Sequence, residues 1–157
     1  MIETPSERLA RQIALAIPAL LLAGAYIGQY GFGLYPCEMC LWQRWPHFAA
    51  VGLALVGSFA APRTLWVGLA ALAILASGGI GAFHAGVEYG WWEGITACAN
   101  AVEQGGDPLD AIMNAPIVRC DMAPWDLFGI SLAGWNFLIS TLAGVAVLVL
   151  LARRSRA

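Results

Sequence analysis

The chemistry of this chain centres on two cysteines three positions apart, Cys37 and Cys40. The thiolate is the reactive form of cysteine, and a helix N-terminus or a positive charge beside it lowers the pKa of the thiol. Both cysteines precede a long apolar segment, so the first turn of the helix expected there points its free amides toward them. Glu38, between them, should disfavour a Cys37 thiolate through its like charge. The spacing is typical of a redox-active pair that exchanges thiols and disulfides.

The chain has only two other cysteines, Cys98 and Cys120, and both lie in its longest polar stretch. We expect them to form a disulfide, which either staples that stretch or exchanges with the first pair. Exchange is favoured by the nearby Cys-x-x-Cys, because a relay between a soluble partner and a membrane needs a mobile carrier.

Arg44 is expected to serve the first pair, because it stands four positions after Cys40 and shares its helix face. A guanidinium buried at a membrane edge is costly unless a partner pairs with it. A Cys40 thiolate, or the carbonyl oxygen of a reducible ligand, would be such a partner. The alternative is that the side chain snorkels to the headgroups.

The two histidines, His47 and His84, are expected at similar depth near the outer ends of two apolar segments. Their imidazoles could hydrogen-bond a quinone oxygen or carry its protons, or they could simply be solvated at the interface. They could instead be axial ligands of a b-type haem. That alternative makes the protein an electron-transfer bundle whose cysteines are staples, and it predicts a haem absorption band.

Other uses of a Cys-x-x-Cys pair are less favoured. Attachment of c-type haem needs a histidine directly after the second cysteine, where this chain has Leu41. A zinc site would need Cys98 and Cys120 as further ligands, and these two lack the tight spacing of a zinc knuckle. We therefore expect no metal. A membrane scaffold with inert cysteines is a further alternative, in which cysteine-to-serine changes cost stability but no redox activity.

The sequence around these residues is that of an integral membrane protein. Of its 157 residues 60% are hydrophobic and 11% are charged, against about 25% charged in a soluble domain. Its apolar runs are long enough to cross about 30 Å of hydrocarbon. They predict an all-α membrane protein, a single four-transmembrane-helix bundle over residues 1–157. The expected spans are residues 13–30, 45–61, 65–84 and 132–151.

The arginines orient this bundle in the lipid bilayer. All eight basic residues are arginines, and six of them lie before the first span, between the second and third, or after the fourth. The positive-inside rule then places both termini in the cytoplasm and all four cysteines outside, where disulfides persist. The net charge of −2 comes without a basic patch, so we expect no nucleic-acid partner.

Two outward loops follow from this orientation, residues 31–44 and 85–131. The second is long and acidic, with acidic side chains from Glu88 to Asp126. Within it, Asp107-Pro108 has the pattern of a helix N-cap followed by a first-turn proline. The apolar residues after it predict a short amphipathic helix on the membrane surface.

The cysteine motif and its surroundings resemble the disulfide bond formation protein B (DsbB) family. The similarity covers nearly the whole chain and includes the order of the two cysteine pairs. The vitamin K epoxide reductase family has a similar architecture, but its loop pair precedes the Cys-x-x-Cys, whereas here it follows. The matching motifs are Pro36-Cys37-x-x-Cys40-x-x-Gln43-Arg44 and Cys120-x-x-x-x-Trp125-x-x-Phe128-Gly129.

This resemblance implies a thiol:quinone oxidoreductase of the bacterial inner membrane, in the known relay that keeps the periplasm oxidising. Its partner would be a reduced, DsbA-like thioredoxin-fold protein, which attacks the Cys98–Cys120 disulfide at Cys98. Cys37–Cys40 would reoxidise those thiols through a transient Cys37–Cys120 bond, and Cys40 would pass the electrons to ubiquinone or menaquinone. The residues expected at the quinone are Arg44, Gln43, His47 and His84.

Overall fold

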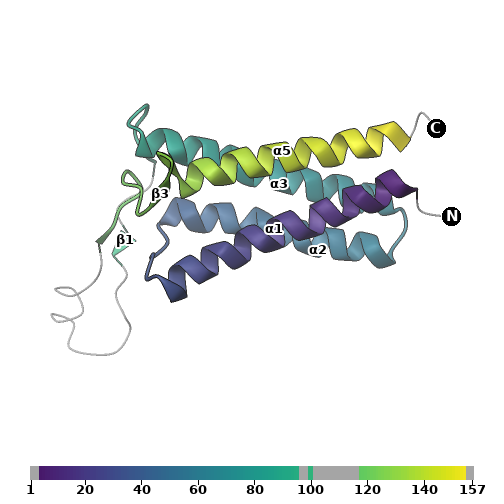
Figure 1. Cartoon of the computed structure of the whole chain (residues 1–157), viewed down its shortest axis with the longest axis horizontal. Helices are drawn as coiled ribbons and strands as arrows, with labels where there is room; N and C mark the ends of the chain where they lie inside the picture. Colours follow the sequence, from purple (N-terminus) through teal and green to yellow (C-terminus); the bar gives the residue numbers. More distant parts are fainter. Residues whose placement is uncertain (1–3, 96–98, 101–116, 155–157) are drawn as a thin grey trace.

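The computed structural model describes residues 4–95, 99–100 and 117–154. Most of these residues form long helices, which run side by side (Figure 1). The helices are α1 (Pro5–Gly31), α2 (Glu38–Phe59), α3 (Arg63–Glu88) and α5 (Leu132–Arg154).

Two short antiparallel ribbons lie at one end of the helices, opposite the two termini (Figure 1). In the first, β1 (Ala99–Asn100) pairs with β2 (Ile117–Val118). In the second, β3 (Asp126–Leu127) pairs with β4 (Ile130–Ser131). The amphipathic helix expected from Asp107 onward lies outside the described residues.

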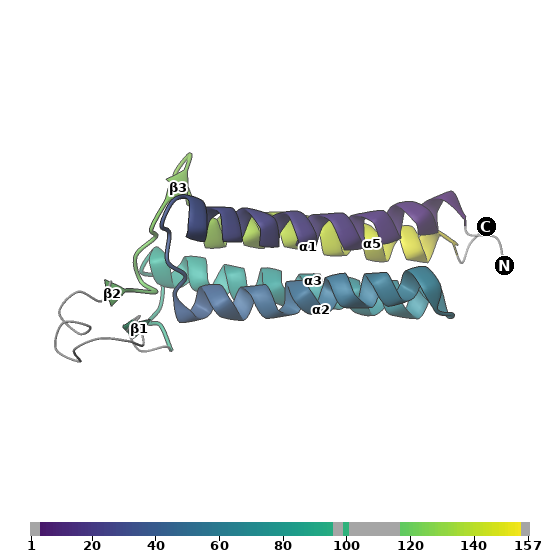
Figure 2. The same cartoon turned by 90° about the horizontal axis from the view of Figure 1, so that it is seen from below.

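The four helices form two layers, with α1 beside α5 and α2 beside α3 (Figure 2). Each helix packs against two neighbours, in the cyclic order α1, α2, α3, α5, so that α1 and α3 lie on a diagonal and touch less. This arrangement is an up-and-down four-helix bundle. It brings the first turn of α2, the last turn of α3 and the start of α5 to the same end.

Three of the helices are long and apolar enough to cross a membrane, namely α1, α3 and the part Leu132–Arg153 of α5. The sequence prediction of a helical membrane protein is therefore confirmed at this level, while the fourth span stays a prediction. Helix α2 is less apolar because its first half carries Glu38, Gln43 and Arg44.

The helices extend beyond the expected membrane spans. Helix α2 begins at Glu38, before the expected span 45–61, so Cys40 and Arg44 are helical, as their predicted shared helix face requires. Helix α3 ends at Glu88 rather than near residue 84. Polar side chains led us to end the apolar run too early, although the helix continues for one more turn.

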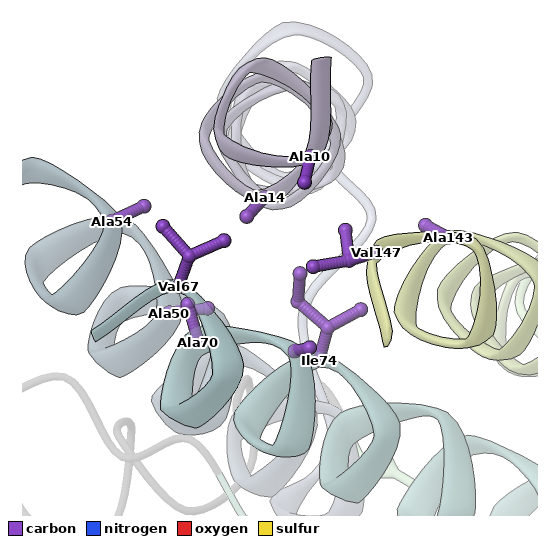
Figure 3. Packing of buried hydrophobic residues seen from close by; sticks show 10 residues of the cluster. Ala10, Ala14, Ala50, Ala54, Val67, Ala70, Ile74, Ala143 and Val147 are labelled. Atoms are coloured by element: carbon purple, nitrogen blue, oxygen red, sulfur yellow. The ribbon is translucent and has the colours of Figure 1, made fainter. Parts of the chain in front are cut away.

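Small residues fill the centre of the bundle, and most of them are alanines (Figure 3). They allow the helix backbones to approach closely, as is usual in membrane bundles. Helices α3 and α5 approach each other closely at Gly81, where an added Cβ would lie 3.0 Å from the Ala133 carbonyl oxygen. The cluster comprises Ala10, Ala14, Ala50, Ala54, Val67, Ala70, Ala71, Ile74, Ala143 and Val147.

Candidate active site

Cys37 is the N-cap of helix α2, and this position brings it to Cys40. Its extended backbone turns the side chain back over the first turn, where Sγ accepts a hydrogen bond from the Cys40 amide at 3.2 Å. The two Sγ atoms are 2.8 Å apart. Cys37 is buried and Cys40 is half-buried. The pair therefore has the proximity that a reversible disulfide needs.

The two thiols differ in acidity, and both precede the segment 45–61 that is expected to cross the membrane. The Cys37 thiol donates a hydrogen bond to Cys40 and is buried, which together raise the pKa of Cys37 to about 12. Accepting that bond lowers the pKa of Cys40. In the reduced pair Cys40 is therefore the more acidic of the two thiols and the one that ionises first. The expected weakness of a Cys37 thiolate is found, but it comes from Cys40 and burial rather than from Glu38.

Cys120 returns from the long loop to the same place. Its Sγ, the Cys37 Sγ and a ring nitrogen of His84 all lie within 4.8 Å of one another, and all three residues are buried. Met39 and Val87 pack around this cluster. The structure thus brings together the two sulfurs that the relay would join across the loops. Cys98 lies outside the described residues.

Arg44 turns toward helix α1. Its guanidinium donates hydrogen bonds to Gln29 Oε1 at 2.6 Å and to the Ala25 carbonyl oxygen at 3.4 Å. It also lies over the Tyr26 ring, 4.9 Å from the centroid. The cost of placing this charge at a membrane edge is thus offset by α1, which the sequence analysis had not considered. Gln29 and Tyr26 are additions to the site.

Gln43 links helices α2, α3 and α5. Its amide nitrogen donates to His84 Nδ1 at 2.9 Å and to the Met39 carbonyl oxygen at 3.2 Å. Its amide oxygen accepts a bond from Asn136 Nδ2 at 2.8 Å. These contacts fix the orientation of the Gln43 amide, so His84 Nδ1 must be an acceptor and the proton of a neutral His84 is on Nε2.

His47 is held by the same network, on its other side. Its Nε2 lies 2.9 Å from Asn136 Oδ1 and 2.9 Å from Ser77 Oγ. Because Asn136 Nδ2 donates to Gln43, its Oδ1 is an acceptor, and His47 Nε2 must carry the proton. His47 Nδ1 is then a lone-pair acceptor, and it is buried without a hydrogen-bond partner among the described residues.

Two cavities flank the cysteine pair. The larger, about 670 Å³, is mostly apolar and lies against α1 and α5. The smaller, about 290 Å³, lies under the segment that follows β2. Cys40 lines both cavities, whereas Cys37 lines the smaller one. The polar residues of the larger cavity are Gln43, Arg44, His47 and Asn136.

The two histidines face different cavities, His47 the larger and His84 the smaller. His84 Nε2 lies 3.5 Å from Cys37 Sγ and 3.6 Å from Glu88 Oε1. The sequence analysis had grouped both histidines at one ligand and had placed Glu88 in the outer loop. Since the histidines share no cavity, the structure gives no support to a haem held between them.

The chain is similar to known disulfide bond formation proteins over nearly its whole length. The family model described as "Disulfide bond formation protein DsbB" matches residues 7–150. A Disulfide bond formation protein B from Verminephrobacter eiseniae (strain EF01-2) is 36% identical over 99% of this chain and 91% of its own length. One from Acidovorax sp. (strain JS42) is 33% identical over 99% and 92%, and one from Azoarcus sp. (strain BH72) is 32% identical over 99% and 100%. No solved structure matches the chain.

Proposed function

Because the chain belongs to the DsbB family of disulfide bond formation proteins, we propose that it carries electrons from a periplasmic dithiol to a membrane quinone. The enzyme is a disulfide-generating oxidoreductase and a multi-pass membrane protein. The haem-bundle alternative has no support from the family. The direction of electron flow, the quinone and the partner are our proposals.

The observation that carries the proposal is the position of Cys40 between the two cavities. On one side, Cys37 lines the smaller cavity and its Sγ lies within 4.8 Å of Cys120 Sγ, where sulfur exchange with the loop would occur. On the other side, the Cys40 thiolate lines the larger, apolar cavity. When Cys120 attacks Cys37, the electron pair of the Cys37–Cys40 bond would pass to Cys40. Cys40 would then hand these electrons on at the larger cavity, on the opposite side of the pair.

The larger cavity suits the head group of ubiquinone or menaquinone. Ligand cavities are typically about 300 to 1,000 Å³, apolar, and supplied with a few placed polar groups. Here those groups are the Arg44 guanidinium, which can donate to a quinone oxygen, and His47, whose Nδ1 lone pair can accept from the hydroxyl of the reduced quinone. A bound quinone would supply the acceptor for two electrons and two protons. Arg44 would orient it and favour negative charge beside Cys40, and Gln43 would keep the two histidines in place.

The partner would act on the loop side. We propose a reduced, DsbA-like thioredoxin-fold protein that attacks the Cys98–Cys120 disulfide at Cys98, through a mixed disulfide. The released Cys120 thiol lies beside Cys37, which supports Cys37 as the sulfur that it attacks. Cys40 then leaves as the thiolate that its low pKa favours.

For the membrane, we propose that α2 crosses from about residue 45 as the fourth span, in the bacterial inner membrane. Support comes from its position alongside α3 for the length of the bundle (Figure 2). Both termini lie at the end of the bundle opposite the strands (Figure 1), whereas Cys37 and Cys40 lie at the start of α2, at the strand end. With the arginines near those termini, the positive-inside rule favours a cytoplasmic location for both ends.

The experiment is anaerobic reduction of a quinone by the purified protein, supplied with a reduced thioredoxin-fold dithiol. We expect partner-dependent reduction, its abolition by Cys40→Ser and a rise in the quinone KM with Arg44→Ala. Arg63→Ala, at the other end of the bundle, is the matched control for loss of a guanidinium. A quinone that stays oxidised, or a Cys40→Ser variant as active as the parent, would refute the proposed function.

A further inference from the structure

Glu88 is a buried carboxylate for which the relay, as described so far, has no use. It is the last residue of α3, and its side chain is only 3% exposed. Its Oε2 is buried and has no hydrogen-bond partner in the described part of the chain. A buried carboxylate is costly unless it is paired or hydrogen-bonded; here the neighbours of Glu88 are the His84 ring and the Ser131 hydroxyl, and Oε2 is the oxygen left without a partner. Glu88 lines the smaller cavity, on the loop side of the cysteines.

His84 connects Glu88 to the reacting sulfurs. Its Nε2 lies 3.6 Å from Glu88 Oε1 and 3.5 Å from Cys37 Sγ. Since Gln43 fixes the proton of a neutral His84 on Nε2, one N–H faces both a carboxylate and a sulfur. The same ring also has a nitrogen within 4.8 Å of Cys120 Sγ. The imidazole therefore holds the carboxylate, Cys37 and Cys120 in one group.

We propose that Glu88 is the proton acceptor for the sulfur exchange between Cys120 and Cys37. This inference rests on the proposed function and assigns a residue to its first internal step. Cys120 leaves Cys98 as a thiolate, and wherever it takes up a proton before it attacks Cys37 that proton must be removed again, because the thiolate is the nucleophile. Glu88 is the carboxylate beside His84 in the smaller cavity, and we assign it as the group that takes this proton. The Nε2–H of His84 faces the Glu88 carboxylate and the Cys37 sulfur and can stabilise negative charge on either of them.

The step balances in atoms and charge. The Cys120 thiol gives its proton to the Glu88 carboxylate, and a Cys120–Cys37 bond forms while the Cys37–Cys40 bond breaks. The Cys120 sulfur is oxidised, and the Cys40 sulfur is reduced and leaves as a thiolate. One negative charge thus moves from Glu88 to Cys40, the thiol whose surroundings favour it. His84 Nε2–H, no longer facing a carboxylate, is then available to Cys37.

The other ionisable groups around the smaller cavity are compatible with this role. Tyr35 and the N-cap Cys37 precede or begin α2, and Cys40 lies in its first turn. His84 and Glu88 come from α3, and Arg119 from the segment after β2. Arg119 pairs with Asp121. His84 donates rather than accepts at Nε2, which leaves Glu88 as the base. Glu88 is therefore assigned as the residue that accepts the proton, and His84 holds it beside the sulfurs.

The test compares the parent with Glu88→Gln and Glu88→Asp in partner-driven quinone reduction from pH 5.5 to 8.5. General bases contribute about 10²- to 10⁴-fold, so we expect Glu88→Gln to lose at least about tenfold at pH 6. The loss should shrink as pH rises, since hydroxide then removes the proton. Glu88→Asp should restore part of the rate. Glu93→Gln, an exposed residue just after α3, is the matched control and should leave the rate and pH profile as in the parent.

A bypass separates this role from folding. In a Cys98→Ser/Cys120→Ser background, dithiothreitol must reduce Cys37–Cys40 directly, so no attack by Cys120 is needed. The loss caused by Glu88→Gln should be confined to the partner-driven reaction. An equal loss in both reactions, or a partner-driven rate and pH profile like the parent's, would overturn the inference. If the parent itself reduces no quinone, the proposed function fails instead, so the two failures are distinguishable.

Discussion

Asn136 Oδ1 lies 2.9 Å from His47 Nε2, and this contact determines which face of the imidazole is left for a ligand. Asn136 is on α5 and His47 on α2, so the contact joins two helices that are diagonal in the bundle. The same amide donates to Gln43 Oε1. One side chain thus sets the proton positions of both histidines, directly at His47 and through Gln43 at His84.

Loss of the Asn136 amide should therefore impair quinone binding without touching a cysteine. In Asn136→Ala, His47 can present either nitrogen to the larger cavity, and Gln43 Oε1 loses its donor. We expect the quinone KM to rise about tenfold and the protein to lose about 1 to 3 kcal/mol of stability, the usual cost of buried polar groups left unpaired. Ser140→Ala removes one bond to Asn136 Oδ1 and should be milder. An unchanged KM in Asn136→Ala would count against His47 as a quinone contact.

The acidity of the two thiols predicts the order in which they are alkylated. The pKa of Cys40 is lowered, so its thiolate persists as pH falls below the range of an ordinary thiol. The pKa of Cys37 is raised to about 12, so it stays protonated throughout the neutral range. In the reduced protein, brief iodoacetamide treatment at pH 7 should label Cys40 before Cys37, as read by mass spectrometry of the peptides. The detergent-denatured protein, which should label both alike, is the control. Faster labelling of Cys37 would contradict the assignment.

Much of the redox centre can be predicted from spacing alone, because Cys37, Cys40 and Arg44 lie within two turns of one helix. The position of Cys120 beside Cys37 depends on how the long loop returns, and spacing cannot reveal that. Similar depth for His47 and His84 does not say which cavity each faces, because that is set by the rotation of α2 and α3.

The position of Glu88 was predicted wrongly for a different reason. We assigned it to the outer loop because the apolar run stops before it, yet α3 continues for one turn and places it four residues after His84. That spacing puts both side chains on one helix face. Gln29 and Asn136 did leave a signal, since each is a polar residue within an otherwise apolar run, and such residues are functional candidates by default.

Gln29 is predicted to position Arg44. Its Oε1 accepts the shortest of the guanidinium's described hydrogen bonds, at 2.6 Å. Gln29→Leu would leave the Ala25 carbonyl oxygen and the Tyr26 ring as partners, so the charge stays compensated but loses its fixed orientation. We expect a rise of about threefold to tenfold in the quinone KM, smaller than in Arg44→Ala, with kcat little changed; a hydrogen bond to a charged group is worth about 1.5 to 3 kcal/mol at most. Gln12→Leu, nearer the other end of α1, is the matched control. A KM equal to the parent's would show that Gln29 does not orient Arg44.

The close contact between α3 and α5 predicts a contrast between two nearby glycines. At Gly81 an added Cβ would lie 3.0 Å from the Ala133 carbonyl oxygen and 3.0 Å from Asn136 Nδ2, whereas at Gly79 it would meet nothing within 4 Å. Gly81→Ala should therefore push α5 away and cost about 1 to 3 kcal/mol, the usual cost of overpacking. Gly79→Ala should be neutral or slightly stabilising, because alanine is the better helix former. The midpoints of unfolding in mixed detergent micelles measure both. Because Asn136 moves with α5, Gly81→Ala should also raise the quinone KM, and equal midpoints for the two variants would mean that the helices are not in contact at Gly81.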